Sequence, residues 1–344
     1  MTLHIVRRSA QETGIPRTMR RVRAWWILIA AAFIGLPPAA TVAAEAWPAH
    51  PIRLIVSFSP GGTTDTLARL VADKLGESLH QPLLIDNRPG AGGVLGAQIG
   101  VRAAPDGYTL LATGLGPLVI ATGLSPTPPY DALRDFTHIA LLGGPPAVLV
   151  VPNESPIRDL DGFISYARAQ PARLEYGSPG VGSQSQLLFE RFAARASIKV
   201  THIPYKGAGQ VTADLLGNHL GAACTTLTGL SEQIRAGVIR AIAVSSIQRL
   251  NDFPSVPTFA EEGYSELTST LWFSLAGPAR LPREIVDRLN AEVVRILRQP
   301  DVVERLRRDG IDPAPLNPVG LTDFVRTESA RWTPIVRSMR LGAD

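Results

Sequence analysis

The sequence has a single cysteine, Cys224, among 344 residues. One cysteine cannot form a disulfide within the chain, so the folded part must be stable without such crosslinks. A length of 344 residues suggests two domains of ordinary size, each large enough to bury its own core. Cys224 lies in an apolar stretch, which indicates a packing role.

An excess of charge is also missing from the folded part. Residues 1–46 hold six of the 34 Lys and Arg residues and two of the 30 Asp and Glu residues, so the rest has 28 of each sign. The formal charge of +4 therefore belongs to the N-terminal segment. Because the remaining chain is neutral, we predict no basic face and no nucleic-acid partner.

Apolar runs long enough to span a membrane are absent. The longest, Trp25–Leu36, has 12 residues, whereas a spanning helix needs about 20. Three arginines between residues 20 and 23 precede it, and small residues follow at 42–46. This pattern favours a cleaved secretory signal over residues 1–46 and a periplasmic protein, with a membrane anchor as the alternative. Met19 could be the true start.

Catalytic signatures are missing as well. The sequence contains no G-x-S-x-G, no G-x-x-x-x-G-K-[ST] and no H-E-x-x-H. Its six histidines are scattered, and no two have the spacing of metal ligands. The segment "GAGGVLG" at 90–96 misses the dinucleotide-binding spacing by one residue. We therefore predict no catalytic residue, no metal and no cofactor.

What the sequence does contain is an alternation of apolar strands and amphipathic helices, which is typical of parallel α/β sheets. We expect strands at 52–58, 83–85, 108–112, 145–152, 174–176, 200–204, 220–224 and 241–245. We expect helices at 64–79, up to 103, 159–169, 184–194, 210–216, 282–298, 301–308 and 321–339.

The apolar runs at 148–151 and 241–244 resemble buried strands more than flexible joints. We interpret them as two crossings between domains. This interpretation predicts a discontinuous first domain, residues 47–147 plus 249–344, and a second domain at 148–248.

The loop "FSPGGTTD" at 58–65 lies between a strand and a helix. Such a loop is at the carboxyl edge of a parallel sheet, where open α/β folds bind ligands. Its backbone N–H groups and the helix dipole favour an anion, and glycines allow close approach. The alternative is a plain turn with Thr63 or Thr64 as the N-cap. Asp65 is explained by the helix dipole alone.

The segment "YGSPGVGSQSQ" at 176–186 repeats this design in the second series. Ser183 and Gln186 have the spacing of a capping box, which is the structural alternative. Ser178, Gly180 and Gly182 remain unexplained by it. A second cluster of N–H groups would face the first across a cleft. Weaker polar candidates, each of which could be a simple turn, are Thr113, Gly114, Tyr205, Thr225 and Thr226.

These segments resemble the Bug, or TctC-type, solute receptors of tripartite tricarboxylate transport systems. The resemblance runs from Trp47 to the C-terminus. It rests on "PIRLIVSFSPGGTTD", "NRPGAGGVLGA", "APDGYTLL", "YGSPGVGSQSQL", "PYKGAG", "LWFSLAGP" and "IVDRLNAEV". It implies a two-domain periplasmic-binding-protein fold of type II-like architecture, with mainly parallel sheets, flanking helices and a ligand in the interdomain cleft.

The resemblance also implies how a carboxylate would be held. Residues of the first loop would bind it from one side: Ser59, Gly61, Gly62, Thr63 and Thr64. Residues of the second loop would bind it from the other: Gly182, Ser183 and Gln184. The sequence departs from its relatives at Ser59, at Gln186, where they often have His, and at Thr225-Thr226, where they often have Asp-Asn.

We therefore expect an exported, non-catalytic and monomeric receptor for a small organic acid without an α-ammonium group. Its partners would be membrane subunits of a tripartite tricarboxylate-type transporter. Two other classes stay open: a ligand-sensing module for signalling, and an exported α/β enzyme, which would need a nucleophile–base pair or a metal site.

Overall fold

The first sheet grows from the apolar strand β1 (Ile52–Val56), in the computed structural model that describes residues 47–171, 174–311, 313 and 315–338. Its order is β2-β1-β3-β10-β4. The bounds of its other strands are β2 Leu83–Asn87, β3 Thr109–Gly114, β4 Phe136–Gly143 and β10 Phe273–Pro278. β1 pairs in parallel with β2 and β3, while β10 runs antiparallel to both of its neighbours.

The second sheet has the same arrangement, with the order β7-β6-β8-β5-β9. Its strands are β5 Ala147–Pro152, β6 Glu175–Ser178, β7 Thr201–Pro204, β8 Ala222–Thr226 and β9 Ile239–Val244. β6 is parallel to β7 and β8, and β5 is antiparallel to β8 and β9. In each sheet one strand therefore opposes four, as expected for a mainly parallel α/β fold.

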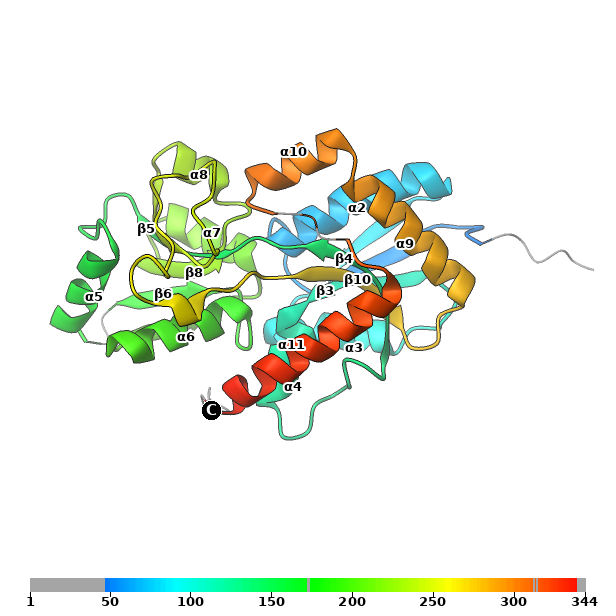
Figure 1. Cartoon of the computed structure of the whole chain (residues 1–344), viewed down its shortest axis with the longest axis horizontal. Coiled ribbons are helices and arrows are strands. Elements are labelled where there is room, and N and C mark those ends of the chain that lie inside the picture. Colours follow the sequence, from blue (N-terminus) through cyan, green and yellow to red (C-terminus); the bar gives the residue numbers. More distant parts are fainter. Residues whose placement is uncertain (1–46, 172–173, 312, 314, 339–344) are drawn as a thin grey trace, which may run out of the picture. The chain divides into compact units, whose positions relative to one another are not determined.

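Helices flank both sheets (Figure 1). Around the first sheet they are α2 Thr63–Leu79, α3 Val94–Val101, α4 Ala121–Leu124, α9 Arg283–Leu297, α10 Pro300–Arg308 and α11 Pro318–Ser338. Around the second they are α5 Leu160–Ala169, α6 Gln184–Ala196, α7 Ala208–Leu216 and α8 Ser231–Arg235. Short turns of other helix types occur at Ala91–Gly93, Gly116–Ile120 and Ser265–Leu267.

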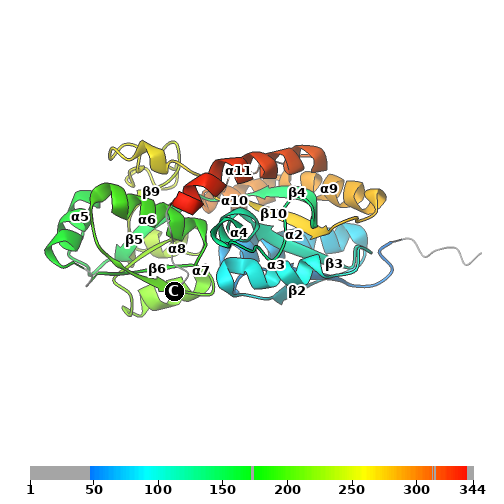
Figure 2. The same ribbon diagram turned by 90° about the horizontal axis from the view of Figure 1, so that it is seen from below.

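Alternating residues of the strands build the cores on either face. On β1, Leu54 packs in the same cluster as residues of α2 and α9, whereas Ile55 packs with residues of α3 and α11. On β5, Leu149 faces the side of α5 and α6, and Val150 faces the side of α7 and α8. Figure 1 shows α2 and α9 on one side of the first sheet and α3 and α11 on the other, and Figure 2 shows the same elements seen from below that view. Strands buried on both faces explain the continuous apolar runs in the sequence.

The sequence did not predict β4, β10 or α8. β10 follows β9 by 28 residues and inserts between β3 and β4 of the first sheet. The segment before it is hydrogen-bonded to the first crossing, because the Leu271 N–H donates to the Pro145 carbonyl at 3.2 Å. Two chain segments thus run side by side between the sheets. The runs at 148–151 and 241–244 are buried strands, as predicted, but both lie within the second sheet as parts of β5 and β9, so the interpretation of these runs as the crossings is wrong. The chain passes between the sheets before β5 and again between β9 and β10.

The predicted secretory leader, residues 1–46, lies outside the described residues. Within the part of the chain that is described, no helix combines the length and apolar character needed to cross a membrane.

Candidate functional site

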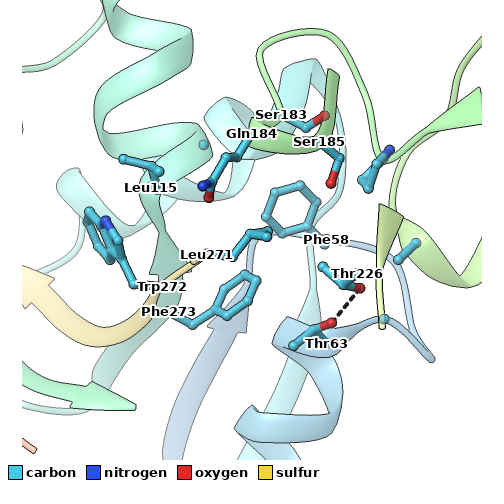
Figure 3. Close-up of a pocket in the computed structure, with 14 residues that line it drawn as sticks. Phe58, Thr63, Leu115, Ser183, Gln184, Ser185, Thr226, Leu271, Trp272 and Phe273 are labelled. Atoms are coloured by element: carbon cyan, nitrogen blue, oxygen red, sulfur yellow. Dashed lines mark hydrogen bonds between the residues drawn. The ribbon is translucent and has the colours of Figure 1, made fainter. Parts of the chain in front are cut away.

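A cavity of about 40 Å³ lies where the loop after β1 meets the loop after β6. Its volume would hold a few water molecules or a group of carboxylate size. Figure 3 shows several of its side chains. The lining residues are Phe58, Gly62, Thr63, Leu115, Gly116, Pro179, Ser183, Gln184, Ser185, Ala208, Thr226, Leu271, Trp272 and Phe273.

Helix α2 begins at this cavity without a side-chain cap. Its N-cap is Gly62, so the alternative of a Thr63 or Thr64 cap is wrong. The Thr63 hydroxyl instead bonds the Thr226 hydroxyl of β8 at 2.6 Å, which joins the two halves of the site (Figure 3). The first intrahelical bond is donated by Thr66 to Gly62. The N–H groups of Thr63 and Thr64 therefore have no partner within the helix.

The N–H of Gly61 is used within its own loop. It donates to Asp65 Oδ2 at 3.0 Å, and Arg69 Nε donates to the same oxygen at 2.9 Å. Asn87 Nδ2 donates to Asp65 Oδ1 at 2.9 Å. Burial alone would raise the pKa of Asp65, but these three hydrogen bonds outweigh it and hold the pKa below its ordinary value. Asp65 thus shapes the loop, a role beyond the dipole interaction expected from the sequence.

Helix α6 repeats this arrangement on the other side. Ser183 is its N-cap and accepts from the Gln186 N–H at 3.2 Å, as the predicted capping box requires. The Gln186 side chain, however, accepts from the Gly182 N–H at 2.8 Å instead of closing the box on Ser183. Gly61 and Gly182 both have positive φ, 79° and 75°. In both loops the glycine N–H is taken by the side chain four residues later, which leaves the first helical N–H groups free.

His202 of β7 supports the second loop from behind. Because Gln186 Oε1 accepts from Gly182, its Nε2 faces His202 Nδ1 at 3.2 Å and donates to it. His202 Nε2 then carries the proton and donates to Ser178 Oγ at 2.7 Å. Burial lowers the pKa of His202 to about 4. The neutral imidazole therefore connects two predicted loop residues, and a proton on Nδ1 would oppose the Gln186 amide.

We expect this histidine to make stability depend on pH. The pKa of His202 in the folded state lies below its ordinary value, so the unfolded chain binds the proton first as the pH falls. Its contribution is complete above about pH 6.5 and is lost as the pH falls toward 4. Urea unfolding between pH 7.5 and 4.5 would measure this slope. His138, whose pKa burial also lowers, contributes in the same direction, so the comparison must be with His202→Gln. An unchanged slope in that variant would contradict the assignment.

Five of the predicted site residues line the cavity: Gly62, Thr63, Ser183, Gln184 and Thr226. The other predicted residues lie outside the lining: Ser59, Gly61, Thr64, Thr113, Gly114, Ser178, Gly182, Tyr205 and Thr225. Tyr205 donates to Asp214 at 2.6 Å. Thr225 alternates with Thr226 along β8, so the two side chains are on opposite faces of the strand. Whether any of them binds a ligand stays a prediction.

Several buried polar atoms near the cavity have no hydrogen-bond partner among the described residues. Gln184 Oε1 and Ser185 Oγ belong to lining residues. Ser59 Oγ, Thr113 Oγ1 and Thr225 Oγ1 lie in the segments around it. Buried polar atoms are nearly always paired, so a group of unpaired ones indicates a place where water or a ligand belongs.

Sequence reasoning missed the apolar part of the lining. Phe58, Leu115, Leu271 and Phe273 line the cavity together with the hydroxyl-bearing loops. Leu271 and Phe273 belong to "LWFSLAGP", a motif used only for the resemblance. Nothing in its composition indicates that the chain returns to the first sheet there.

Comparison with known proteins decides the family. A family model described as "Tripartite tricarboxylate transporter family receptor" matches residues 67–341. The chain belongs to this family. It is 38% identical to Protein BugT of Bordetella pertussis over 312 residues, which are 90% of this chain and 94% of that protein. The predicted resemblance is thereby confirmed.

Solved structures agree. The periplasmic binding protein BugD is similar with a TM-score of 0.83 and 27% identity, over 86% of this chain and 99% of that one. Rpa4515 of R. palustris, solved with adipate, is similar with a TM-score of 0.82 and 32% identity, over 86% and 99%. The protein is thus a solute-binding receptor of the tripartite tricarboxylate transporter type and not an enzyme.

Proposed function

We propose that this receptor binds the carboxylate of a small organic acid between the N-termini of α2 and α6. The observation that carries the proposal is the pair of helix starts on one cavity with no ionisable residue among its described lining. Free N–H groups of Thr63, Thr64, Gln184 and Ser185 supply donors, and the helix dipoles add positive potential. Several such hydrogen bonds can hold one charge without an arginine.

The ligand would lack an α-ammonium group. An ammonium needs a carboxylate or several acceptors when it is buried. No lining residue in the described chain is acidic, and Thr226 is the second residue of the pair where relatives often carry Asp-Asn. A receptor for an amino acid would place an acidic side chain there. An organic acid without the amine therefore suits the site better.

Calorimetry with matched ligands tests this function. We expect butanoate and phenylacetate to bind at least about tenfold more tightly than butanamide, phenylacetamide, 2-aminobutanoate and phenylglycine. Thr226→Asp should shift the preference toward the amino acids, whereas the neutral control Thr226→Asn should not. Equal binding of each acid and its amide would refute carboxylate recognition.

Export and delivery complete the proposal. The arginine-rich leader and the membership in a family with a periplasmic member suggest cleavage between Glu45 and Trp47. The intact mass of protein recovered from the periplasm would decide this.

The partners would be membrane subunits of a tripartite tricarboxylate-type transporter, and a sensory role remains the second candidate. Co-purification with those subunits distinguishes the two.

The domain boundaries also belong to the proposal. We place the second boundary nearer residue 268 than 248, because Phe253 and Val256 pack with strands of the second sheet. The Val244 N–H donates to the Pro257 carbonyl, and the Phe259 N–H to the Val244 carbonyl. Residues 249–267 would then move with the second domain. Limited proteolysis followed by isolation of residues 147–267 as a folded fragment tests this assignment.

A further inference from the structure

The part of the cavity lining made by Phe58, Leu115, Leu271 and Phe273 is apolar. Figure 3 shows Phe58, Leu271 and Phe273 grouped together, with Ser185 on the other side of the Phe58 ring. The lining is therefore divided. Helix starts and hydroxyls form one part, and two phenyl rings with two leucines form the other.

The apolar part offers nothing to a second negative charge. None of the lining residues in the described chain is Lys, Arg or His. The indole N–H of Trp272 is already donated to Glu328 of α11 at 3.0 Å, and Glu328 also accepts from Trp332 at 3.1 Å. This donor is therefore unavailable to a ligand.

Gln184 strengthens the asymmetry. Its Nε2 donates to the Thr270 carbonyl at 3.3 Å, so the unpaired atom of this amide is the acceptor Oε1. The amide end lies on the side of Leu115 and Leu271 in Figure 3. An acceptor in that position repels a carboxylate and suits a neutral or hydrogen-bond-donating ligand group.

We infer that the ligand is a monocarboxylate with an apolar body, aliphatic or aromatic, and that dicarboxylates are poor ligands. The inference rests on the proposed function, since it takes the carboxylate to lie at the helix starts. The observed cavity has room for little more than the carboxylate, so Phe58, Leu271 and Phe273 must move apart to admit the tail. Burying an apolar tail against these side chains is favourable. Burying a second charge there without a partner is costly. The receptor would thus differ from the similar structure solved with adipate.

Matched pairs test the inference, each pair differing by a methyl group against a carboxylate. Butanoate is compared with succinate, and 4-methylphenylacetate with 4-carboxyphenylacetate, by calorimetry on the mature wild-type protein at pH 7.5. We expect each monocarboxylate to bind at least about tenfold more tightly than the dicarboxylate with which it is paired. A dicarboxylate that binds as well as or better than its partner overturns the inference and leaves the proposed function standing. If none of the acids binds better than its amide, the proposed function fails and the inference falls with it.

A charge placed in the apolar part should reverse the preference. Leu271→Arg is expected to raise the affinity for succinate and 4-carboxyphenylacetate, relative to that for the paired monocarboxylates, by about tenfold or more. Leu271→Gln is the matched control, because it is polar without a charge and should improve neither dicarboxylate to this extent. If Leu271→Arg is folded and the ratios stay at the wild-type values, Leu271 does not face the ligand tail and the inference is overturned. The wild-type comparison holds even if this variant does not fold.

Discussion

Replacing Thr63 with proline is expected to weaken carboxylate binding by roughly 10- to 100-fold while leaving the fold intact. Thr63 is the first residue of α2, where proline is tolerated because the helix does not use that N–H. The preceding Gly62 has φ −88° and ψ 171°, an extended conformation that suits a residue before proline. The substitution thus removes one backbone donor from the cavity with little change to the helix.

Thr63→Val is the matched control. Proline and valine both remove the hydroxyl that bonds Thr226, but only proline removes the N–H. The difference in affinity between the two variants, measured by calorimetry with butanoate, therefore reports the amide alone. If Thr63→Val loses as much affinity as Thr63→Pro, the hydroxyl contact between the two halves matters and the amide does not.

The same experiment can be made on the second helix. Gln184 is the first residue of α6, and Ser183 before it has φ −74° and ψ 149°. Gln184→Pro should therefore also remove one donor without breaking the helix, with Gln184→Ala as its control. We expect a loss of similar size, roughly tenfold or more, because each helix start supplies its own charge-assisted hydrogen bonds. If only one of the two proline variants loses affinity, the carboxylate binds at the start of that helix alone.

The two loops that meet at the cavity could be singled out from the sequence because they contain more glycines and hydroxyls than a turn needs. The alternation of strands and helices likewise predicted most elements of both sheets. The sequence did not show that the N–H groups of Gly61 and Gly182 are taken by the side chains of Asp65 and Gln186. A glycine followed four residues later by an acceptor side chain is the signal that could have shown this. At α7 the Lys206 N–H donates to Gln210 Oε1 at 3.0 Å, so the same contact to a side chain four residues later also forms without a glycine.

The apolar part of the cavity could not be predicted for a different reason. It depends on β10, which pairs with β3 although more than 150 residues separate them in the chain. Local sequence contains no information on such a return, and a continuous apolar strand resembles any other buried segment. The side chains of Leu271 and Phe273 reach the cavity only because this strand is inserted between β3 and β4. Prediction therefore succeeded where a loop follows its own strand and failed where the chain returns from a distance.

Gly209→Ala is expected to reduce ligand affinity by more than roughly 100-fold through the packing of the two halves. The halves meet through backbone: the Ser59 N–H donates to the Lys206 carbonyl at 3.2 Å. A Cβ on Gly209 would lie 2.3 Å from the carbonyl oxygen of Pro60 in the first loop. Because that atom belongs to the backbone, the loop cannot move aside as a flexible side chain could. The contact between the first loop and the start of α7 would then be lost, and the bound carboxylate would remain in contact with water.

The expected loss is separable from misfolding because alanine favours the helix that contains this position. In the open ligand-free state that hinge closure implies, a Cβ at this position would be clear of the Pro60 carbonyl. Gly209 lies in the first turn of α7 without positive φ, so alanine should keep or slightly raise the thermal stability of that state. Gly76→Ala in α2 is the control, since its Cβ would meet only ordinary contacts from 3.5 Å outward. Calorimetry gives the affinity, and small-angle scattering gives the radius of gyration. We expect saturating ligand to lower this radius in the wild type and in Gly76→Ala but not in Gly209→Ala. If Gly209→Ala binds as tightly as the control and contracts with it, the glycine contact is not required for closure, and the ligand must bind with the two loops further apart than they are in this structure.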